Sequence, residues 1–141
     1  MALNPNIYSL FLKNYIMSKR DSKLLLEDIL EASNKIFSYL FDFSFEDFTN
    51  DSKTIDAVIR NFEIIGEAAN RLPNEFKELH NNIEWYKIIG LRNRIVHEYM
   101  GVDTSIIWNI SKDFLPLFHN DINLLLNFLE EFQPRSVSSQ P

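Results

Sequence analysis

Two residues of catalytic type lie five positions apart in the second half of the chain, Arg92 and His97. Histidine exchanges protons close to neutral pH, and arginine carries a permanent charge on a fork of N–H groups that matches phosphate oxygens. Such a pair suits a site that moves a proton while it holds an anion. The chain has no cysteine, which excludes thiol nucleophiles, thiolate metal sites and disulfides.

Arg92 is predicted to lie in the middle of an apolar helix stripe. At 100° per residue, five mostly apolar side chains fall within about 60° of it. A charge at such a position must be paired or face a cleft, because an unpaired buried charge costs several kcal/mol or more. Both alternatives stay open: an arginine that pairs with a carboxylate or snorkels to solvent, or one that faces a functional cleft. The five side chains are Trp85, Ile88, Ile89, Val96 and Tyr99.

His97 is about 140° around an ideal helix from Arg92, so the two side chains cannot converge on one atom. They can meet if the helix end unwinds before Gly101. They can also meet if a two-fold axis brings two copies of the helix together. A shared site on a regular helix therefore predicts a homodimer whose active cleft lies on the symmetry axis.

The elements that must position these residues are helices. Apolar periodicity predicts an all-α fold with main helices over residues 22–41, 52–72, 83–99 and 104–132. The first is expected to be capped by Asp21 or Ser22, the second by Asp51 or Ser52, and the last is expected to be kinked or broken at Pro116. Residues 43–50 and 73–81 are expected to form brief helical turns. Four main helices with short connections indicate a helical bundle.

The domain organisation expected from this pattern is simple. Residues 1–18 are an N-terminal extension, residues 19–132 the bundle, and residues 133–141 a polar tail expected to be disordered. A signal peptide begins with a basic segment, whereas the first six residues here contain no Lys or Arg. No apolar run approaches the roughly 20 residues of a membrane span. We expect a cytoplasmic, prokaryotic protein without a membrane segment.

The overall charge limits the possible partners. The formal net charge is −6 and the isoelectric point is near 5.0, so a generic polyanion binder is excluded. Any contact with nucleic acid requires a local basic patch. Only 3 glycines are present, none in a phosphate-binding loop, and the 3 histidines show no metal-ligand spacing. No metal and no cofactor are expected.

Two segments resemble a known family. Arg92-x4-His97-x-Tyr99, followed by Met-Gly-Val-Asp, resembles the signature of HepT-like toxins in the HEPN superfamily of helical ribonucleases. Residues 57–73, Ala-Val-Ile-Arg-Asn-Phe-Glu-Ile-Ile-Gly-Glu-Ala-Ala-Asn-Arg-Leu-Pro, resemble the second long helix of that family. The likeness covers about residues 19–132. One departure is Glu98, at a position where a small residue, often glycine, is common in the family.

The resemblance implies a HEPN-type bundle of four to five helices that acts as a metal-independent endoribonuclease, the toxin of a type VII-like toxin–antitoxin system. His97 is then the general base or acid and Arg92 the phosphate clamp, and the RNA products carry 2′,3′-cyclic phosphate and 5′-OH ends. Asn93, one helical turn before His97, is a candidate to orient the His97 ring or a phosphate. Arg94, on the same outer side, is a candidate RNA contact or a solvated surface charge. No DNA substrate is expected.

The resemblance also assigns Tyr99 as the residue that receives AMP from a partner, a minimal nucleotidyltransferase antitoxin of the MntA type. By spacing alone, Tyr99 packs at the helix end. The polar side of the second helix, which includes Glu67, either pairs with itself or lines the dimer cleft and supports the site. Gly66 is expected to allow close helix packing. The alternative function is a non-catalytic, dimeric HEPN interaction module that binds a nucleotidyltransferase-like partner.

Overall fold

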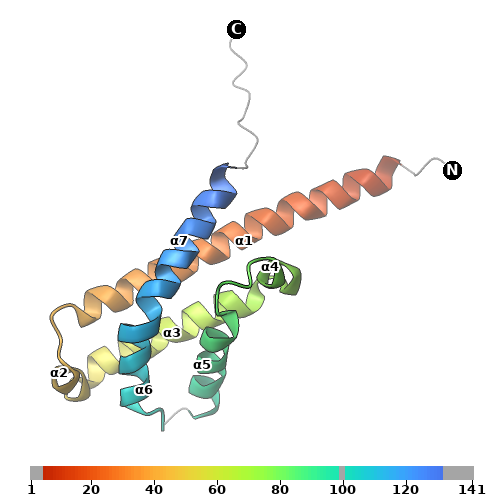
Figure 1. The fold of residues 1–141 in the computed structure, drawn as a ribbon. Helices are drawn as coiled ribbons and strands as arrows, with labels where there is room; N and C mark the ends of the chain where they lie inside the picture. The colour runs from red at the N-terminus through yellow and green to blue at the C-terminus, as the bar shows by residue number, and fades with distance from the viewer. Residues whose placement is uncertain (1–4, 99–100, 132–141) are drawn as a thin grey trace.

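The computed structural model describes residues 5–98 and 101–131, with side chains described from Arg20 onward. Four long helices build the fold (Figure 1): α1 (Pro5–Leu40), α3 (Ser52–Arg71), α5 (Trp85–His97) and α7 (Leu115–Glu131). Three short helices connect them: α2 (Phe45–Thr49), α4 (Asn74–Leu79) and α6 (Thr104–Asn109). No strand occurs within the described ranges. The predicted all-α bundle is confirmed.

Helix α3 is the centre of the bundle, because it packs against α1 on one side and against α5 on the other. Helix α7 crosses α1 and closes the core from the remaining side (Figure 1). The core consists of aliphatic and aromatic side chains from all four long helices, with further contributions from the connecting segments, among them Phe48 of α2 and Ile107 of α6. The largest fully buried side chains include Trp85, Phe48 and Phe62.

The bounds of α3 agree with those predicted from its sequence. The Asp51 carboxylate accepts a hydrogen bond from the Thr54 amide at 3.0 Å and so caps the first turn. At the other end, Lys77 of α4 is buried and its Nζ donates to the carbonyl oxygens of Ala69 at 3.2 Å and Asn70 at 3.4 Å. Burial lowers the pKa of Lys77. The amine satisfies carbonyls that the end of a helix leaves without partners.

The predicted start of the first helix is wrong. Helix α1 begins at Pro5 and continues through residues 21 and 22, and Ser22 is buried inside it rather than capping it. Between Pro5 and Asp21 the sequence has no further proline and no glycine, so nothing in it interrupts a helix. Proline itself is well tolerated in the first helical turn. No helix within the described residues is long and apolar enough to cross a membrane.

The irregularity expected at Pro116 is a π-helical turn over Ile110–Phe114, which joins α6 to α7. Its wider hydrogen bonding includes the Leu115 amide, which donates to the Ile110 carbonyl. A proline has no N–H for the carbonyl four residues earlier, and its ring would clash with that carbonyl in a regular helix. The π-helical turn therefore lies just before Pro116, whose ring a regular α-helix would not accommodate. The tail at 133–141 lies outside the described residues.

Two partly buried histidines predict how the stability depends on pH. The His119 ring lies edge-on to Phe37 at 5.3 Å, and the His80 ring lies 4.7 Å from Phe76. Burial lowers the pKa of both histidines below 6.5 in the folded protein. The unfolded chain then binds more protons, so the free energy of unfolding decreases as the pH falls below about 6.5. Thermal unfolding should therefore occur at lower temperature at about pH 5.5 than at pH 7.5.

The double variant His80→Gln, His119→Gln tests this origin. Glutamine does not titrate in this range, so the change in Tm between the two pH values should become smaller than in the wild type. An unchanged difference in Tm would show that other groups cause the pH dependence.

Candidate functional site

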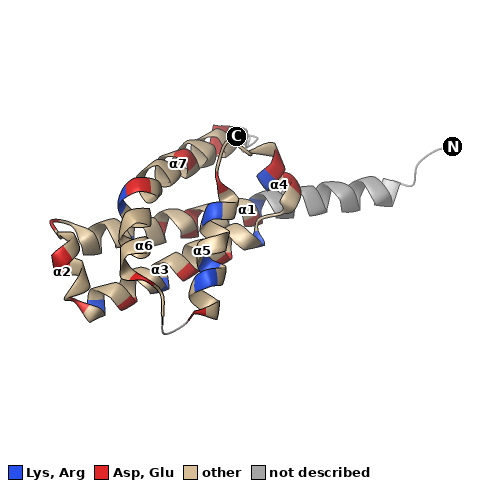
Figure 2. Ribbon diagram, turned by 60° about the horizontal axis from the view of Figure 1, so that its bottom comes forward, with Lys and Arg blue, Asp and Glu red and all other residues tan. Residues whose placement is uncertain are grey.

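Helix α5 is basic although the protein is acidic. Its 13 residues include Lys87, Arg92 and Arg94 and no acidic residue, whereas the whole chain has a net charge of −6. Figure 2 shows these basic positions on α5 beside acidic positions on the neighbouring α3. Lys87 and Arg94 lie on one side of α5, and Arg92 lies roughly 140–160° around the helix from them, so the positive charge is spread around α5.

Arg92 lies at the edge of the buried face of α5, which corrects its predicted place in the middle. The buried side chains are Trp85, Ile88, Leu91 and Ile95, whereas Val96 is 51% exposed. The centre of the buried face is thus rotated away from Arg92. This position allows the Arg92 stem to pack against α3 while its guanidinium reaches the protein surface.

Gly66 on α3 allows this packing, as predicted. A Cβ atom at Gly66 would overlap the Cβ of Arg92, and it would lie 2.9 Å from Arg92 Cγ and 3.1 Å from the Ile88 carbonyl oxygen. Arg92 Cβ and the Ile88 carbonyl are fixed to the α5 backbone, so the overlap could be relieved only by moving α5 away from α3. Any larger residue at position 66 would therefore separate the two helices.

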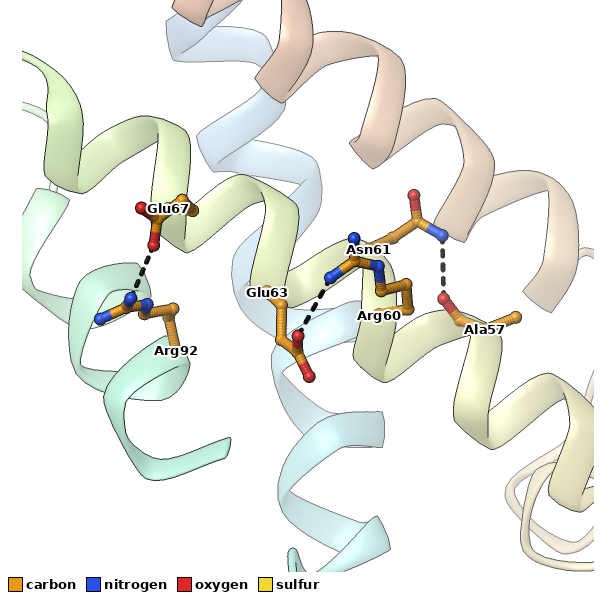
Figure 3. A network of polar contacts seen from close by, with 6 residues as sticks. All are labelled: Ala57, Arg60, Asn61, Glu63, Glu67 and Arg92. Carbon is orange, nitrogen blue, oxygen red and sulfur yellow. Dashed lines mark hydrogen bonds and ion pairs between the residues drawn. The ribbon is translucent and has the colours of Figure 1, made fainter. Parts of the chain in front are cut away.

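The Arg92 guanidinium is held by two side chains. Its Nη2 lies 2.6 Å from the Glu67 carboxylate (Figure 3). Its Nη1 donates to Asn93 Oδ1 at 2.9 Å. The Arg92 side chain is 28% exposed and that of Glu67 is 49% exposed, so the ion pair is accessible to solvent. A guanidinium has five N–H groups, and these contacts leave some of them for a ligand. Asn93 accepts a hydrogen bond from Arg92 here, and no hydrogen bond joins it to the His97 ring.

Arg92 also faces a surface groove of about 350 Å³ between α1, α3 and α5. Both sequence alternatives for Arg92 are thus realised at once, since it is paired and lies in a cleft. Three arginines and three carboxylates line the groove over an aliphatic floor. His97 is not among its lining residues, which are Leu25, Asp28, Arg60, Glu63, Ile64, Glu67, Ala68, Arg71, Arg92 and Val96.

His97 is the last residue of α5 and is exposed. Among the described residues, none forms a hydrogen bond or an ion pair with its ring. Arg92 and His97 belong to one uninterrupted α-helix that ends at His97, so unwinding of the helix does not bring them together. Within one chain they face different sides of α5. Tyr99 lies outside the described residues.

The end of the signature has a structural role. Arg94 Nε lies 3.2 Å from the Glu98 carboxylate, one helical turn away. Asp103 caps α6, where it accepts hydrogen bonds from the Ser105 hydroxyl at 2.7 Å and the Ser105 amide at 2.9 Å. These two hydrogen bonds, with a smaller contribution from the charge of Arg94, lower the pKa of Asp103. Asp103 thus stabilises the first turn of α6.

The polar side of the second helix, which the sequence analysis proposed as a possible cleft lining, supplies Arg60, Glu63 and Glu67 to the groove. The sequence analysis missed Arg71 and Asp28. Arg71 is four residues from Glu67 and therefore lies on the same face of α3, a spacing that could have indicated it. Asp28 comes from α1, and its position depends on how α1 packs against α3, which no local pattern encodes. No group of three His, Asp or Glu side chains suited to hold a metal occurs among the described residues.

The all-α bundle, with Arg92 and His97 on its third long helix, is consistent with a HEPN-type fold. The model of the family described as Ribonuclease HepT-like matches residues 29–125. The chain therefore belongs to the HepT-like family of the HEPN superfamily.

Two relatives match this chain over most of their own length. The chain is 45% identical over 98 residues to "Probable ribonuclease HepT" of Thermococcus cleftensis, which covers 70% of this chain and 89% of the relative. It is 38% identical over 109 residues to "Putative RNase MJ1380" of Methanocaldococcus jannaschii, which covers 77% of this chain and 100% of the relative. No solved structure matches the chain.

Two glycines provide a matched test of the helix contact. Gly66→Ala should lower the free energy of unfolding by about 1–3 kcal/mol or more, because the added methyl group overlaps Arg92. Gly90→Ala, in the middle of α5, should raise it by about 0.4–1 kcal/mol, since a Cβ there meets nothing within 4 Å and alanine favours the helix. Denaturant unfolding measures both. Equal effects of the two substitutions would contradict the close contact at Gly66.

Proposed function

We propose that this protein is a metal-independent endoribonuclease, the toxin of a type VII-like toxin–antitoxin pair, in which Arg92 and His97 act on one RNA phosphate. Membership of the HepT-like family supports ribonuclease activity. The observation that carries the proposal is the way in which the Arg92 side chain is held. Its guanidinium is held in a fixed position at the surface, with N–H groups left for an anion.

The reaction follows from the two side chains. His97 removes the proton of a ribose 2′-OH, and the 2′-oxygen attacks the adjacent phosphorus. Arg92 stabilises the added negative charge on the phosphorane oxygens. The bond to the 5′-oxygen then breaks, and this oxygen leaves with a proton supplied by a general acid. The products are a 2′,3′-cyclic phosphate and a 5′-OH.

The two residues act together across a two-fold axis. Because they face different sides of one regular helix, Arg92 of one copy and His97 of a second copy form each site in the proposed homodimer. Asn93 supports Arg92 through its hydrogen bond, and Glu67 supports it through the ion pair. Arg94, on the outer side of α5, is assigned in this proposal as an RNA contact.

A cleavage assay in EDTA tests the activity. Unmodified wild type should cleave transfer RNA or total RNA and leave cyclic phosphate ends, while Arg92→Ala and His97→Ala should each lower the rate by about 10²-fold or more. Products with a 5′-phosphate, or cleavage that only a metal ion restores, would contradict the mechanism. The mass of each protein preparation should be measured first, because an adduct on Tyr99 would suppress cleavage.

Mixing the two inactive variants tests the shared site. In a mixed dimer, one of the two sites receives an intact Arg92 from one copy and an intact His97 from the other. An equal mixture should therefore regain about a quarter of the wild-type activity after subunit exchange. If both residues acted within one chain, the mixture would stay inactive.

We further propose that a minimal nucleotidyltransferase antitoxin silences the enzyme by transferring AMP to Tyr99. Tyr99 is two residues beyond His97 in the signature. Nucleotide phosphates attached there would bring negative charge and bulk next to the proposed site and compete with RNA for the cations.

Incubation with such a nucleotidyltransferase and ATP tests the role of Tyr99. The wild type should gain the mass of AMP and lose its ribonuclease activity. Tyr99→Phe should gain no mass and stay active under the same conditions. Modification of another residue, or modification of Tyr99 without loss of activity, would contradict the proposal.

A second function, a non-catalytic dimeric module that binds a nucleotidyltransferase-like partner, is favoured by one observation. Glu67 neutralises Arg92 in the free protein, as expected of a structural ion pair. In that case unmodified wild type would cleave no RNA, and Arg92→Ala would lower stability or dimer affinity instead.

A further inference from the structure

We propose that the groove between α1, α3 and α5 binds the backbone of single-stranded RNA on both sides of the phosphate held by Arg92. Arg60 and Arg71 of α3 would contact the flanking phosphates. This inference rests on the proposed ribonuclease function and extends it to the path of the substrate. It assigns a role to residues that lie outside the signature segment.

The arginines of the groove are arranged along a line. Arg60 and Arg71 both line the groove and are eleven residues apart on α3, which corresponds to roughly 16 Å along the helix axis. Glu67 lies between them on the same helix and holds Arg92, which reaches over from α5 (Figure 3). A chain of phosphates that follows α3 would thus meet Arg92 between the other two cations.

The Arg60 guanidinium is directed by a weak contact that a phosphate can replace. Arg60 Nη1 lies 3.3 Å from the Glu63 carboxylate, and the Arg60 side chain is 70% exposed. Exposed ion pairs of this kind contribute little free energy, because water and salt screen them. A phosphate group offers the same oxygen geometry with more charge, so it competes well for the guanidinium.

The floor of the groove suits a backbone contact. Leu25, Ile64, Ala68 and Val96 provide aliphatic surface, and no aromatic ring lines the groove. Without rings for stacking, bases gain little specific recognition here. RNA bound in the groove is therefore held through phosphate and sugar, and its affinity should depend weakly on sequence and strongly on salt.

The acidic charge of the protein is compatible with this site. The groove carries equal numbers of arginines and carboxylates, so it is less repulsive to phosphate than a surface with the average charge of the chain. Its carboxylates still oppose binding. Removal of the Glu63 carboxylate, which does not contact Arg92, should therefore strengthen RNA binding, whereas removal of an arginine should weaken it. Opposite changes in RNA affinity for the two kinds of substitution distinguish the proposal from general damage to the fold.

Binding of a fluorescent single-stranded RNA of mixed sequence tests the proposal. The full chain carries His97→Ala so that the probe stays intact. On this background, Arg60→Gln and Arg71→Gln should each weaken binding roughly threefold to tenfold at low salt. Each should also reduce the slope of log affinity against log salt by about 0.7. Glu63→Gln should strengthen binding.

Lys35→Gln and Glu31→Gln are the matched controls. These residues form an exposed ion pair at 3.6 Å on α1, outside the groove, and their substitution changes the net charge by the same amounts. They should alter affinity much less than the groove variants. Equal effects of the groove and control variants would overturn the proposal, because the response would then come from net charge alone.

The outcomes distinguish the groove from the proposed activity. If cleavage requires Arg92 and His97 but Arg60→Gln and Arg71→Gln bind RNA like the controls, the groove assignment fails and the ribonuclease stands. If the groove variants weaken RNA binding but wild type cleaves nothing, the RNA path stands and the activity fails. Variants that lose only the nucleotidyltransferase partner would identify the groove as a protein-binding surface and overturn the RNA assignment.

Discussion

At Gly66, where α3 crosses closest to Arg92 of α5, α3 has no side chain between the two backbones. The bare Cα of Gly66 faces the stem of Arg92, and even a methyl group at Gly66 would overlap it. This contact sets the spacing of the two helices and hence the reach of Arg92 to Glu67 at 2.6 Å. It also sets the width of the groove that α3 and α5 share with α1. The position of the Arg92 guanidinium thus depends on residue 66 having no Cβ atom.

The ion pair between Glu67 and Arg92 is best understood as a device for orientation. At 49% exposure, the Glu67 carboxylate remains in contact with water, so the pair adds little to the free energy of unfolding. A carboxylate that fixes a flexible arginine does reduce the entropy that a ligand must remove on binding. In the proposed site, this preorganisation offsets part of the repulsion that an acidic protein exerts on RNA.

The fold could be predicted from the sequence because its signals are local. Asp51 was recognisable as a cap, and the period of 3.6 in α3 matches its buried face. The start of α1 was missed because Asp21 and Ser22 are residue types that often cap helices. No residue after Pro5 breaks the helix, so it continues through both of them. The predicted stripe of α5 was rotated, since Leu91 and Ile95 become buried only through the way α5 packs on α3.

The candidate site was also predictable in part, because some of its signals are local. Arg92 was identified because a charge next to apolar positions demands a partner, and its partner Glu67 came from the segment that resembles the family. The position of the groove was not predictable, because it depends on the packing of three helices.

The geometry of α5 constrains every mechanism that uses both signature residues. A regular helix holds Arg92 and His97 about 140° apart, and α5 is regular from Trp85 to His97. One phosphate can therefore meet both side chains only where a second surface presents the missing group. A second copy is the simplest source of that group, because a two-fold axis near α5 supplies both residues to both sites at once. Under this arrangement a single chain holds the anion site, with Glu67 and Asn93 around Arg92, and gains its proton-transfer group only on assembly.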